Sequence, residues 1–566
     1  MTMIGRVIMA KMTGARFIAE TFKGYGVSTV FFVPSILKLG LVEMEKVGIR
    51  RILCHSEKSA AYMADAYARV THRPGVAMAQ SVGAANLASG LQDAYLASSP
   101  VIAISGRAPM AKRPNHNYQE IDHRPLYDPV TKYNVYVDTP QQLAPHLRQA
   151  FREAVSGTPG PVHLDLSGIR GEEVTEVEAD YDVIIEETFA SYPPFRPEPE
   201  SERVRQAARL LAQAQRPVMV AGGGATASGA SAEVVKLAEM LSMPVATALN
   251  GKNLIPDNHP LSVGVVGTYS RWCANQVVYE ADLVLYVGSQ TSDQSTNVWT
   301  TPKKGTKVIQ IDINPEELGR SYPNVVSLMG DARQTLRKII EASEAISRPS
   351  WTKRAQDLVK QWRQELEPKM TSQDAPTRPE RLCRELSNWL PGNSVLVSDT
   401  GHAGIWTGTM VDLTQPGQTF IRCAGSLGWG FPAALGAKAA APERPVVCFT
   451  GDGGMWYHIG ELETAVRSGL NAIIVVNNNR SLNQDRAGVE RAYGSAPGNK
   501  EEIWVFNDVD FAKVAQSMGA AGIRVNKPGQ LKGALEQALE ESKRKPVVVD
   551  VVTDKDIIAP LAKMPG

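Results

Sequence analysis

Short apolar runs alternate with helical patterns along almost the whole chain, and no other feature constrains the fold as strongly. The runs are rich in β-branched residues and lie at 28–33, 75–79, 100–105, 217–221, 281–287, 307–311, 445–450, 471–476 and 546–552. Strands that are apolar on both faces, each followed by an amphipathic helix, are typical of parallel sheets covered by helices. The sequence therefore predicts an α/β fold from end to end.

Two segments interrupt this alternation and divide the 566 residues into three predicted domains. Residues 186–202 combine Pro, Glu and Ser, a composition typical of an exposed linker. Residues 343–378 are charged, with a short amphipathic helical pattern at about 351–366. The expected domains, each of ordinary size, are residues 1–185, 203–345 and 370–566.

Composition argues against several classes of partner. Lys and Arg (60) nearly balance Asp and Glu (59), so no basic field predicts binding to nucleic acid or to an anionic membrane surface. No apolar stretch reaches the length of about 18 residues that a transmembrane helix requires. The five cysteines are scattered without a Cys-x-x-Cys pair, which disfavours a zinc site and a disulfide framework. We therefore expect a cytoplasmic protein with a small-molecule substrate.

The segment at 449–479, FTGDGGMWYHIGELETAVRSGLNAIIVVNNN, is the most informative one. A predicted strand ends in the Gly-Asp-Gly-Gly turn at 451–454, a helix follows at about 459–468, and a second strand ends in three asparagines at 477–479. In a parallel βαβ unit both strand ends open on one edge of the sheet, so Asp452 and the asparagines should converge. Carboxylate and amide oxygens suit Mg²⁺, and the glycines allow backbone N–H groups to approach a diphosphate. The alternative is a plain Asp-Gly turn beside a polar loop.

This arrangement resembles the signature of the thiamine-diphosphate enzymes, in which Gly-Asp-Gly is followed further along the chain by an Asn pair. The resemblance implies that Asp452, Asn479 and the backbone carbonyl of Ser481 bind Mg²⁺. Asn477 or Asn478 would place the amide ligand one or two positions earlier. The cofactor-binding residues implied nearby are Gly453, Gly454, Leu482 and Asn483.

A second motif, HSEKSAAYMADAYAR at 55–69, is similar to the family pattern His-Glu-x-x-Ala-x-x-Met-Ala. Thiamine needs a carboxylic acid at its N1′ nitrogen, so that the 4′-imino group can remove the C2 proton and form the ylid. The resemblance implies that Glu57 provides this acid. A glutamate at the start of a helix can also serve only as a partner of the helix dipole.

Further segments extend the resemblance over almost the whole chain. Residues 81–86, SVGAAN, stand where relatives carry Ser-Gly-Pro-Gly-x-x-Asn beside the pyrimidine, with departures that begin at Val82. The loop that holds the diphosphate corresponds to Gly401, His402 and Ala403. The segment that bends thiamine corresponds to residues 425–429, in which Leu427 is the apolar wedge, Gly425 offers its carbonyl to the 4′-amino group, and Ser426 lies between them.

Within the family, the chain looks closest to the branch that contains acetohydroxyacid synthase, glyoxylate carboligase, and the oxalyl-CoA decarboxylase and 2-hydroxyacyl-CoA lyase group. The likeness to this branch is carried by residues 106–109, 118–120 and 311–315. Glyoxylate carboligases lack the activating glutamate, so Glu57 argues against that assignment. The branch implies pyrimidine-binding and diphosphate-binding parallel-sheet domains that flank a Rossmann-like central domain. It also implies a homodimer or homotetramer with sites at the dimer interface.

Three loops, at 34–38, 116–120 and 482–486, are expected to surround the substrate. The candidate pocket residues are Ser35, Ile36, Leu37 and Gln484, and the candidate proton-handling residues are His116, Tyr118 and Gln119. Acetohydroxyacid synthases usually carry small glycines in the first loop and apolar residues in the third. In this chain the first loop carries Ile36 and Leu37 instead, and the third loop is polar, which favours a polar or charged substrate over pyruvate with a simple 2-oxo acid. A solvated loop histidine is the alternative for His116.

The central domain has glycines at 222–224 directly after a predicted strand, although the full Gly-x-Gly-x-x-Gly spacing is lacking. Central domains of the family hold FAD in some members, ADP or CoA in others, and nothing in many. Asp312 is suited to a ribose or adenine, but Gln290 stands where nucleotide-binding relatives often carry an Arg. We therefore expect a non-redox nucleotide or none.

Taken together, these patterns predict a thiamine-diphosphate-dependent lyase or carboligase that acts on a 2-oxo acid or a 2-hydroxyacyl(-CoA) compound through a C2 ylid and an enamine. The alternative within the family is an acetohydroxyacid-synthase-type transferase with bound FAD. A nicotinamide dehydrogenase would leave the Gly-Asp-Gly and Asn pattern unexplained. A non-catalytic paralogue would be expected to have lost Glu57, Asp452 or Asn479, and all three are present.

Overall fold

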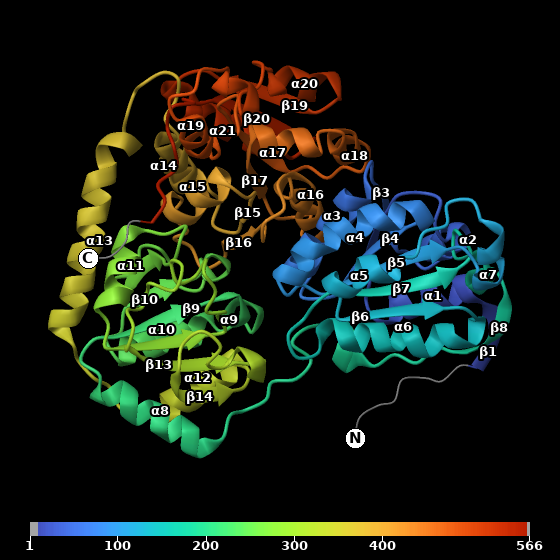
Figure 1. The fold of residues 1–566 in the computed structure, drawn as a ribbon, viewed down its shortest axis with the longest axis horizontal. Helices are drawn as coiled ribbons and strands as arrows, with labels where there is room; N and C mark the ends of the chain where they lie inside the picture. The colour runs from blue at the N-terminus through green and yellow to red at the C-terminus, as the bar shows by residue number, and fades with distance from the viewer. Residues whose placement is uncertain (1–8, 563–566) are drawn as a thin grey trace.

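The computed structural model describes residues 9–562, which form three six-stranded parallel sheets. Figure 1 shows the three sheets in three separate lobes, coloured blue to teal, green to yellow and orange to red along the chain. The inner strands are buried on both faces because successive side chains enter cores on opposite sides. In the strand at Thr29–Phe32, for example, Val30 and Phe32 enter one core and Phe31 enters the other. The predicted α/β fold is confirmed.

The N-terminal sheet has the strand order β3-β2-β4-β5-β7-β6. Its strands are β2 (Thr29–Phe32), β3 (Arg50–Leu53), β4 (Gly75–Ala79), β5 (Val101–Arg107), β6 (Tyr133–Val137) and β7 (Val162–Ser167). Its helices are α1 (Gly14–Gly24), α2 (Lys38–Lys46), α3 (Glu57–Thr71), α4 (Ser81–Leu96), α5 (Arg124–Tyr127), α6 (Pro140–Val155) and α7 (Glu172–Thr175). A small antiparallel ribbon pairs β1 (Met9–Thr13) with β8 (Glu178–Asp182).

The C-terminal sheet repeats the N-terminal topology, with the strand order β16-β15-β17-β18-β20-β19. Its strands are β15 (Val395–Ser398), β16 (Thr419–Arg422), β17 (Val446–Gly451), β18 (Ile473–Asn478), β19 (Ala521–Val525) and β20 (Val547–Val552). Its helices are α14 (Pro379–Trp389), α15 (His402–Met410), α16 (Gly430–Ala440), α17 (Asp452–Tyr457), α18 (Glu461–Arg467), α19 (Arg486–Tyr493), α20 (Phe511–Ser517) and α21 (Leu531–Glu541). In both sheets the strand order reverses next to the first strand, and ligands of open α/β sheets bind at such a reversal.

The central sheet has the order β11-β10-β9-β12-β13-β14, which is the Rossmann order of strands. Its strands are β9 (Pro217–Ala221), β10 (Val245–Thr247), β11 (Ser262–Val265), β12 (Leu283–Val287), β13 (Lys307–Asp312) and β14 (Asn324–Met329). Its helices are α8 (Ser201–Gln213), α9 (Gly223–Ala227), α10 (Ser231–Met240), α11 (Trp272–Glu280) and α12 (Ala332–Glu341). The Rossmann-like central domain is therefore confirmed.

The connection between the first two sheets is only partly exposed. It contains a 3₁₀ turn at Glu187–Ala190, and Tyr192 is buried in it. The Tyr192 amide donates to the backbone carbonyl of His72 at 3.0 Å, and the two rings are 5.1 Å apart. The apolar ring anchors a segment whose composition alone indicates an exposed linker.

The connection between the second and third sheets is one long helix, α13 (Pro349–Met370), which Figure 1 shows along the outer edge of the central and C-terminal lobes. It is longer than the helical pattern at 351–366 indicates. Its buried residues recur every three to four positions and belong to a core shared with the central and C-terminal domains: Trp351, Ala355, Leu358, Trp362 and Leu366.

Within residues 9–562, no helix is both long and apolar enough to cross a membrane.

The N-terminal and C-terminal domains of one chain pack directly against each other through α3, α4 and α16. Gly436 makes this close approach possible, because a side chain there would collide with the backbone of Met63. The Trp429 indole donates to Asp65 at 3.0 Å, and the guanidinium of Arg69 lies over the same indole ring. The contact is therefore both apolar and specifically hydrogen-bonded.

Candidate active site

The predicted metal ligands lie together at the carboxyl edge of the C-terminal sheet. Asp452 begins α17 directly after β17, and Asn479 directly follows the neighbouring strand β18. Oδ2 of Asp452 accepts a hydrogen bond from the Ser481 amide at 2.9 Å. Oδ1 of Asn479 accepts from the same amide at 3.1 Å and from the Ser481 hydroxyl at 2.9 Å. The three residues are buried and share one small space.

The chemistry of this donor set fits a hard divalent cation. Burial raises the pKa of Asp452 to about 7, although the amides of Gly453 and Ser481 oppose that shift. A buried carboxylate is costly without a positive partner, and a cation would remove that cost. One carboxylate, one amide oxygen and one backbone carbonyl match the oxygen ligands of Mg²⁺, which takes its remaining ligands from water and phosphate. The part of the chain that the structure describes has no His, Cys, Asp and Glu cluster typical of a transition metal.

The neighbouring asparagines have different surroundings. Asn478 points to the opposite face of β18, where its amide donates to Asp550 at 2.8 Å and to the Val509 carbonyl at 3.1 Å. Asn477 pairs in register with Gly451 inside the sheet. Asn478 is thus occupied by structural hydrogen bonds, whereas Asn479 stands beside Asp452.

The loop after β15 meets the loop after β18, as expected for residues that hold a diphosphate. His402 begins α15, and its Nδ1 lies 2.6 Å from Oδ1 of Asn483. Burial lowers the pKa of His402, so the neutral ring donates from Nδ1 to the amide oxygen. Gly401 has a φ of +64°, and a Cβ atom there would lie 2.7 Å from the Gln484 side chain. The positive φ favours glycine at this position, whereas the flexible Gln484 side chain could move away.

Asp399, which the motifs do not identify, connects three of the predicted cofactor segments. It follows β15 and accepts hydrogen bonds from the Thr450 hydroxyl at 2.8 Å and from the Gly428 amide at 3.2 Å. A Cβ atom on Gly454 would lie 2.5 Å from its Oδ2. Burial raises the pKa of Asp399 to about 6. An acidic residue at a strand end beside the loop at 401–403 is the only sequence signal that could have indicated it.

Glu57 lies in the N-terminal domain with the segment that the resemblance places beside the pyrimidine. It is the first residue of α3, and its Oε2 accepts from the Asn86 amide at 3.2 Å. Gly83 leaves room for the carboxyl group, because a side chain there would collide with Oε1 of Glu57. Glu57 and residues 81–86 are therefore adjacent. The contacts of Asp452 are within the C-terminal domain.

The other predicted pocket residues have unequal exposure. Tyr118 is 78% exposed and His116 is also exposed, whereas the Gln119 carbonyl accepts from the Ser81 hydroxyl at 2.5 Å. Ile36 and Leu37 are buried in the core of the N-terminal domain, so within one chain neither faces open space. Ser35 is half-buried beside them.

Three family models match the chain: the N-terminal TPP-binding domain of thiamine pyrophosphate enzymes at 12–126, their central domain at 204–339 and their C-terminal TPP-binding domain at 399–551. A probable acetolactate synthase large subunit of Methanocaldococcus jannaschii is 32% identical to this chain, over 98% of this chain and 94% of its own length. The chain belongs to the thiamine pyrophosphate enzyme family.

Two other relatives carry similar descriptions. A probable acetolactate synthase large subunit of Methanococcus aeolicus is 31% identical over 93% of this chain and 90% of its own length. The acetolactate synthase isozyme 3 large subunit of Escherichia coli is 29% identical over 96% of each chain. This member of the thiamine pyrophosphate family is therefore a thiamine-diphosphate-dependent C–C lyase or carboligase of the acetohydroxyacid synthase branch, as the motifs predict.

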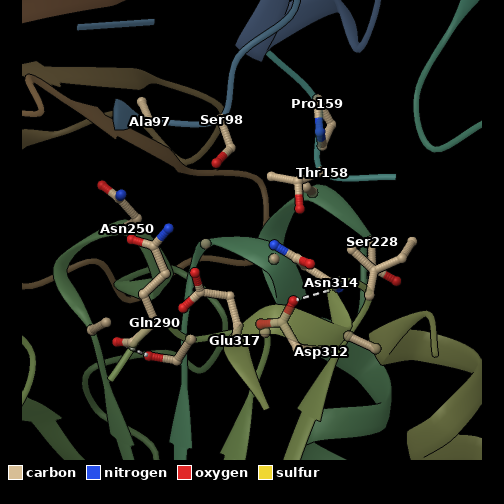
Figure 2. A pocket seen from close by; sticks show the side chains of 18 of the residues that line it. Ala97, Ser98, Thr158, Pro159, Ser228, Asn250, Gln290, Asp312, Asn314 and Glu317 are labelled. Atoms are coloured by element: carbon tan, nitrogen blue, oxygen red, sulfur yellow. Dashed lines mark hydrogen bonds between the residues drawn. The ribbon is translucent and has the colours of Figure 1, made fainter. Parts of the chain in front are cut away.

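The central domain of the chain has a cavity of about 400 Å³. The cavity lies at the carboxyl edge of the central sheet, where the strand order reverses between β9 and β12. Figure 2 shows Gln290, Asp312 and Glu317 in its floor, with Ser98 and Thr158 of the N-terminal domain opposite them. Burial raises the pKa of Asp312 to about 6.

Proposed function

We propose that this chain is a Mg²⁺-dependent carboligase of the acetolactate synthase type, which releases CO₂ from a 2-oxo acid and joins the remaining acyl group to the carbonyl carbon of a second compound. The observation that carries the proposal is the buried group of Asp452, Asn479 and Ser481 at the carboxyl edge of the C-terminal sheet, where β17 and β18 end. The similarity to relatives described as acetolactate synthase large subunits supports the reaction type.

Each predicted residue has a role that fits its position. Thiamine diphosphate, when bound, supplies at C2 the nucleophile and the electron sink for C–C chemistry. The side chains of Asp452 and Asn479 and the carbonyl of Ser481 would hold the cation. Glu57 would hold a proton at the pyrimidine N1′, and Asn86, which donates to its carboxyl group, would keep that group oriented.

The remaining cofactor contacts are assigned by segment. The backbone of Gly453 and Gly454 and the loop of Gly401, His402 and Ala403 would bind the diphosphate. The carbonyl of Gly425 would accept from the 4′-amino group, and Leu427, which is half-buried, would support the bent form of the cofactor. Ser426, Leu482 and Asn483 complete the assigned set. Asp399 would keep these loops together.

We propose that the active form is a homodimer or a dimer of dimers. In one chain the carboxyl of Glu57 contacts Asn86 of its own domain, whereas Asp452 contacts Gly453 and Ser481 of the other domain. A site that needs both groups would then be completed by a second copy of the chain. Apolar side chains are exposed near both groups, among them Val82 and Tyr457. Exposed apolar residues of this kind are typical of a surface that a second chain covers.

We propose that the central cavity holds a non-redox nucleotide or none. Among the described residues that line it, Arg422 is the only basic one, whereas Asp312 and Glu317 are acidic. Carboxylates suit the hydroxyl groups of a ribose, but they would repel the ribose phosphate of CoA. This lining therefore disfavours the alternative of a 2-hydroxyacyl-CoA lyase.

Free, buried cysteines agree with the cytoplasm as the location of the protein.

Polar groups beside the diphosphate loop favour an acceptor substrate that carries a polar group. Gln484 lies against Gly401 and within 3.4 Å of the Tyr269 hydroxyl of the central domain. His116, Tyr118 and Gln119 would contribute from the N-terminal domain of the partner copy. These residues would bind and orient the substrate carbonyl and exchange protons with it.

Turnover screening tests the proposal. Purified protein would be incubated with pyruvate, glyoxylate, larger 2-oxo acids, oxalyl-CoA and a 2-hydroxyacyl-CoA, each with and without thiamine diphosphate and Mg²⁺. We expect a 2-hydroxy-3-oxo acid product from the 2-oxo acids only when both additives are present. Turnover confined to the CoA substrates would contradict the proposal, and the Asp452→Ala variant provides the inactive control.

A further inference from the structure

The carboxylate of Asp93 accepts hydrogen bonds from three successive backbone amides of the C-terminal domain. Asp93 lies in α4, and its donors are the amides of Ala424 at 2.8 Å, Gly425 at 3.0 Å and Ser426 at 2.9 Å. Hydrogen bonds to an ionised acceptor are roughly twice as strong as those between neutral groups. One side chain of the N-terminal domain thus holds a turn that lies 331 to 333 residues further along the chain.

Asp93 is fully buried, and its charge has nearby partners. Nη2 of Arg69 lies 3.7 Å from Oδ1, and the thiol of Cys423 lies 3.2 Å from Oδ2. Asp65, which is also buried, binds Arg69 from the other side at 2.6 Å. A buried carboxylate is retained only where it is paired and hydrogen-bonded, and these groups meet that requirement.

The turn held by Asp93 leads directly into the residues assigned to bend thiamine. At the far end of this segment the Gly428 amide donates to Asp399. Leu427 lies between the two anchors, and the carbonyl of Gly425 belongs to the peptide unit whose Ser426 amide donates to Asp93. Their positions therefore depend on two buried carboxylates, one from each domain.

The same helix also contacts Glu57. The first turns of α4 contain Gly83, which lies against the Glu57 carboxyl group, and Asn86, which donates to it. Asn86 and Asp93 are separated along α4 by about 10 Å, at about 1.5 Å per residue. One rigid helix thus connects the activating glutamate to the turn at 424–426.

We propose that Asp93 is a positioning residue for thiamine diphosphate, and that α4 contributes to two different active sites of the dimer, Asn86 to one and Asp93 to the other. This inference rests on the cross-subunit site of the proposed function. In that arrangement Glu57 serves the cofactor bound by the partner copy. Asp93 acts on the cofactor bound by its own chain.

The first test compares cofactor binding in the homodimeric variants. Asp93→Asn keeps the size but removes the charge and one acceptor oxygen. We expect the Kd for thiamine diphosphate in calorimetry to rise by at least about tenfold, which corresponds to about 1.4 kcal/mol. We also expect a changed near-ultraviolet circular dichroism signal of the bound cofactor. Gln92→Ala is the matched control, because Gln92 donates a long hydrogen bond of 3.4 Å to the Ser426 hydroxyl, and we expect its Kd within twofold of wild type.

If Asp93 had only a structural role, the melting temperature and the cofactor affinity of the variant would change differently. The melting temperature would fall, but the folded variant would bind thiamine diphosphate with wild-type affinity, and that result would overturn the positioning role. If Asp93→Asn does not fold, Asp93→Glu keeps the charge and displaces it by one methylene group. The same weakened cofactor binding is expected of it, and wild-type affinity in Asp93→Glu would equally overturn the role.

The second test uses mixed dimers. A Glu57→Gln chain combined with an Asp452→Ala chain should regain one intact site, built from the metal loops of the first chain and Glu57 of the second. Asp93→Asn added to the first chain should remove most of the regained activity at limiting cofactor. Added to the second chain, it should leave that activity unchanged.

Equal effects of the two placements, or the reverse order, would overturn the assignment of Asp93 to the site of its own chain. If the parent pair regains no activity, the cross-subunit site of the proposed function fails, and the assignment of Asn86 and Asp93 to different sites fails with it. Calorimetry on the Asp93→Asn homodimer still decides the positioning role in that case, so the two failures are distinguishable.

Discussion

The backbone amide of Ser481 donates a 2.9 Å hydrogen bond to Oδ2 of Asp452, although the two residues are 29 positions apart. The bond joins the turn after β17 to the loop after β18, and it orients the carboxylate before any cation is bound. Because the donor is a backbone group, the orientation does not depend on another flexible side chain. Such preorganisation lowers the entropic cost of binding.

Substitution of the two proposed side-chain ligands should abolish metal-dependent cofactor binding. Asp452→Ala and Asn479→Ala remove oxygens that would bridge the protein to the charged diphosphate, so we expect no measurable Kd for thiamine diphosphate in calorimetry with Mg²⁺. Asn478→Ala is the matched control. It should lower the melting temperature, because Asp550 loses a donor, while cofactor affinity is retained. Loss of affinity in Asn478→Ala alone would reassign the ligand.

The purified protein should be colourless. Gln290 lines the central cavity at the position where flavin-binding relatives often carry an Arg, which disfavours FAD. We expect no flavin absorbance in the native protein and none in the supernatant after heat denaturation. A stoichiometric flavin in that supernatant would show this expectation to be wrong and would favour the FAD-containing transferase.

Light scattering should find a dimer or a tetramer under assay conditions. In one chain Glu57 contacts Asn86 whereas Asp452 contacts Ser481, so a monomer would have no site that contains both groups. A monomer should therefore be inactive. We expect specific activity to fall on dilution in step with the loss of the larger species. Full activity in a monodisperse monomer would contradict the cross-subunit site.

Acidification should destabilise the protein partly through His163. Burial lowers the pKa of His163 to about 3, in a site where its ring lies between Ser105 and Asn134 and stacks on Tyr127. In the unfolded chain a histidine titrates at about 6.5, so below that pH the unfolded state binds a proton that the folded state does not. Stability should therefore fall as the pH decreases from about 6.5 towards the folded pKa.

The His163→Gln variant isolates this contribution. Its melting temperature will be lower than that of wild type near neutral pH, because stacking and one hydrogen bond are lost. Between about pH 7.5 and pH 5.5, however, the decrease should be smaller in the variant than in wild type. Parallel decreases in the two proteins would assign the acid sensitivity to other groups.

The fold could be predicted, and so could the proximity of the proposed metal ligands, because their signals are local. Apolar runs identify the strands, and the Gly-Asp-Gly turn and the Asn run lie in one βαβ unit. Asp93 and Asp399 were not predicted, because their partners are mainly backbone amides, which have no sequence signature. Those of Asp93 lie more than three hundred residues away. Tyr192 was missed for a related reason, since its burial depends on a contact with His72 across the fold.

Exchange of the thiamine C2 proton in the Glu57→Gln variant tests the central claim most directly. Gln keeps the size and the hydrogen bond to Asn86, but it cannot hold the proton that activates the pyrimidine. Deuterium exchange at C2 would be followed by quenched NMR in wild type and variant, with cofactor occupancy matched by calorimetry. We predict exchange slower by about 10²–10⁴-fold, with only a modest change in Kd. Equal exchange rates in the two proteins would contradict the account and leave Glu57 as a structural residue at the start of α3.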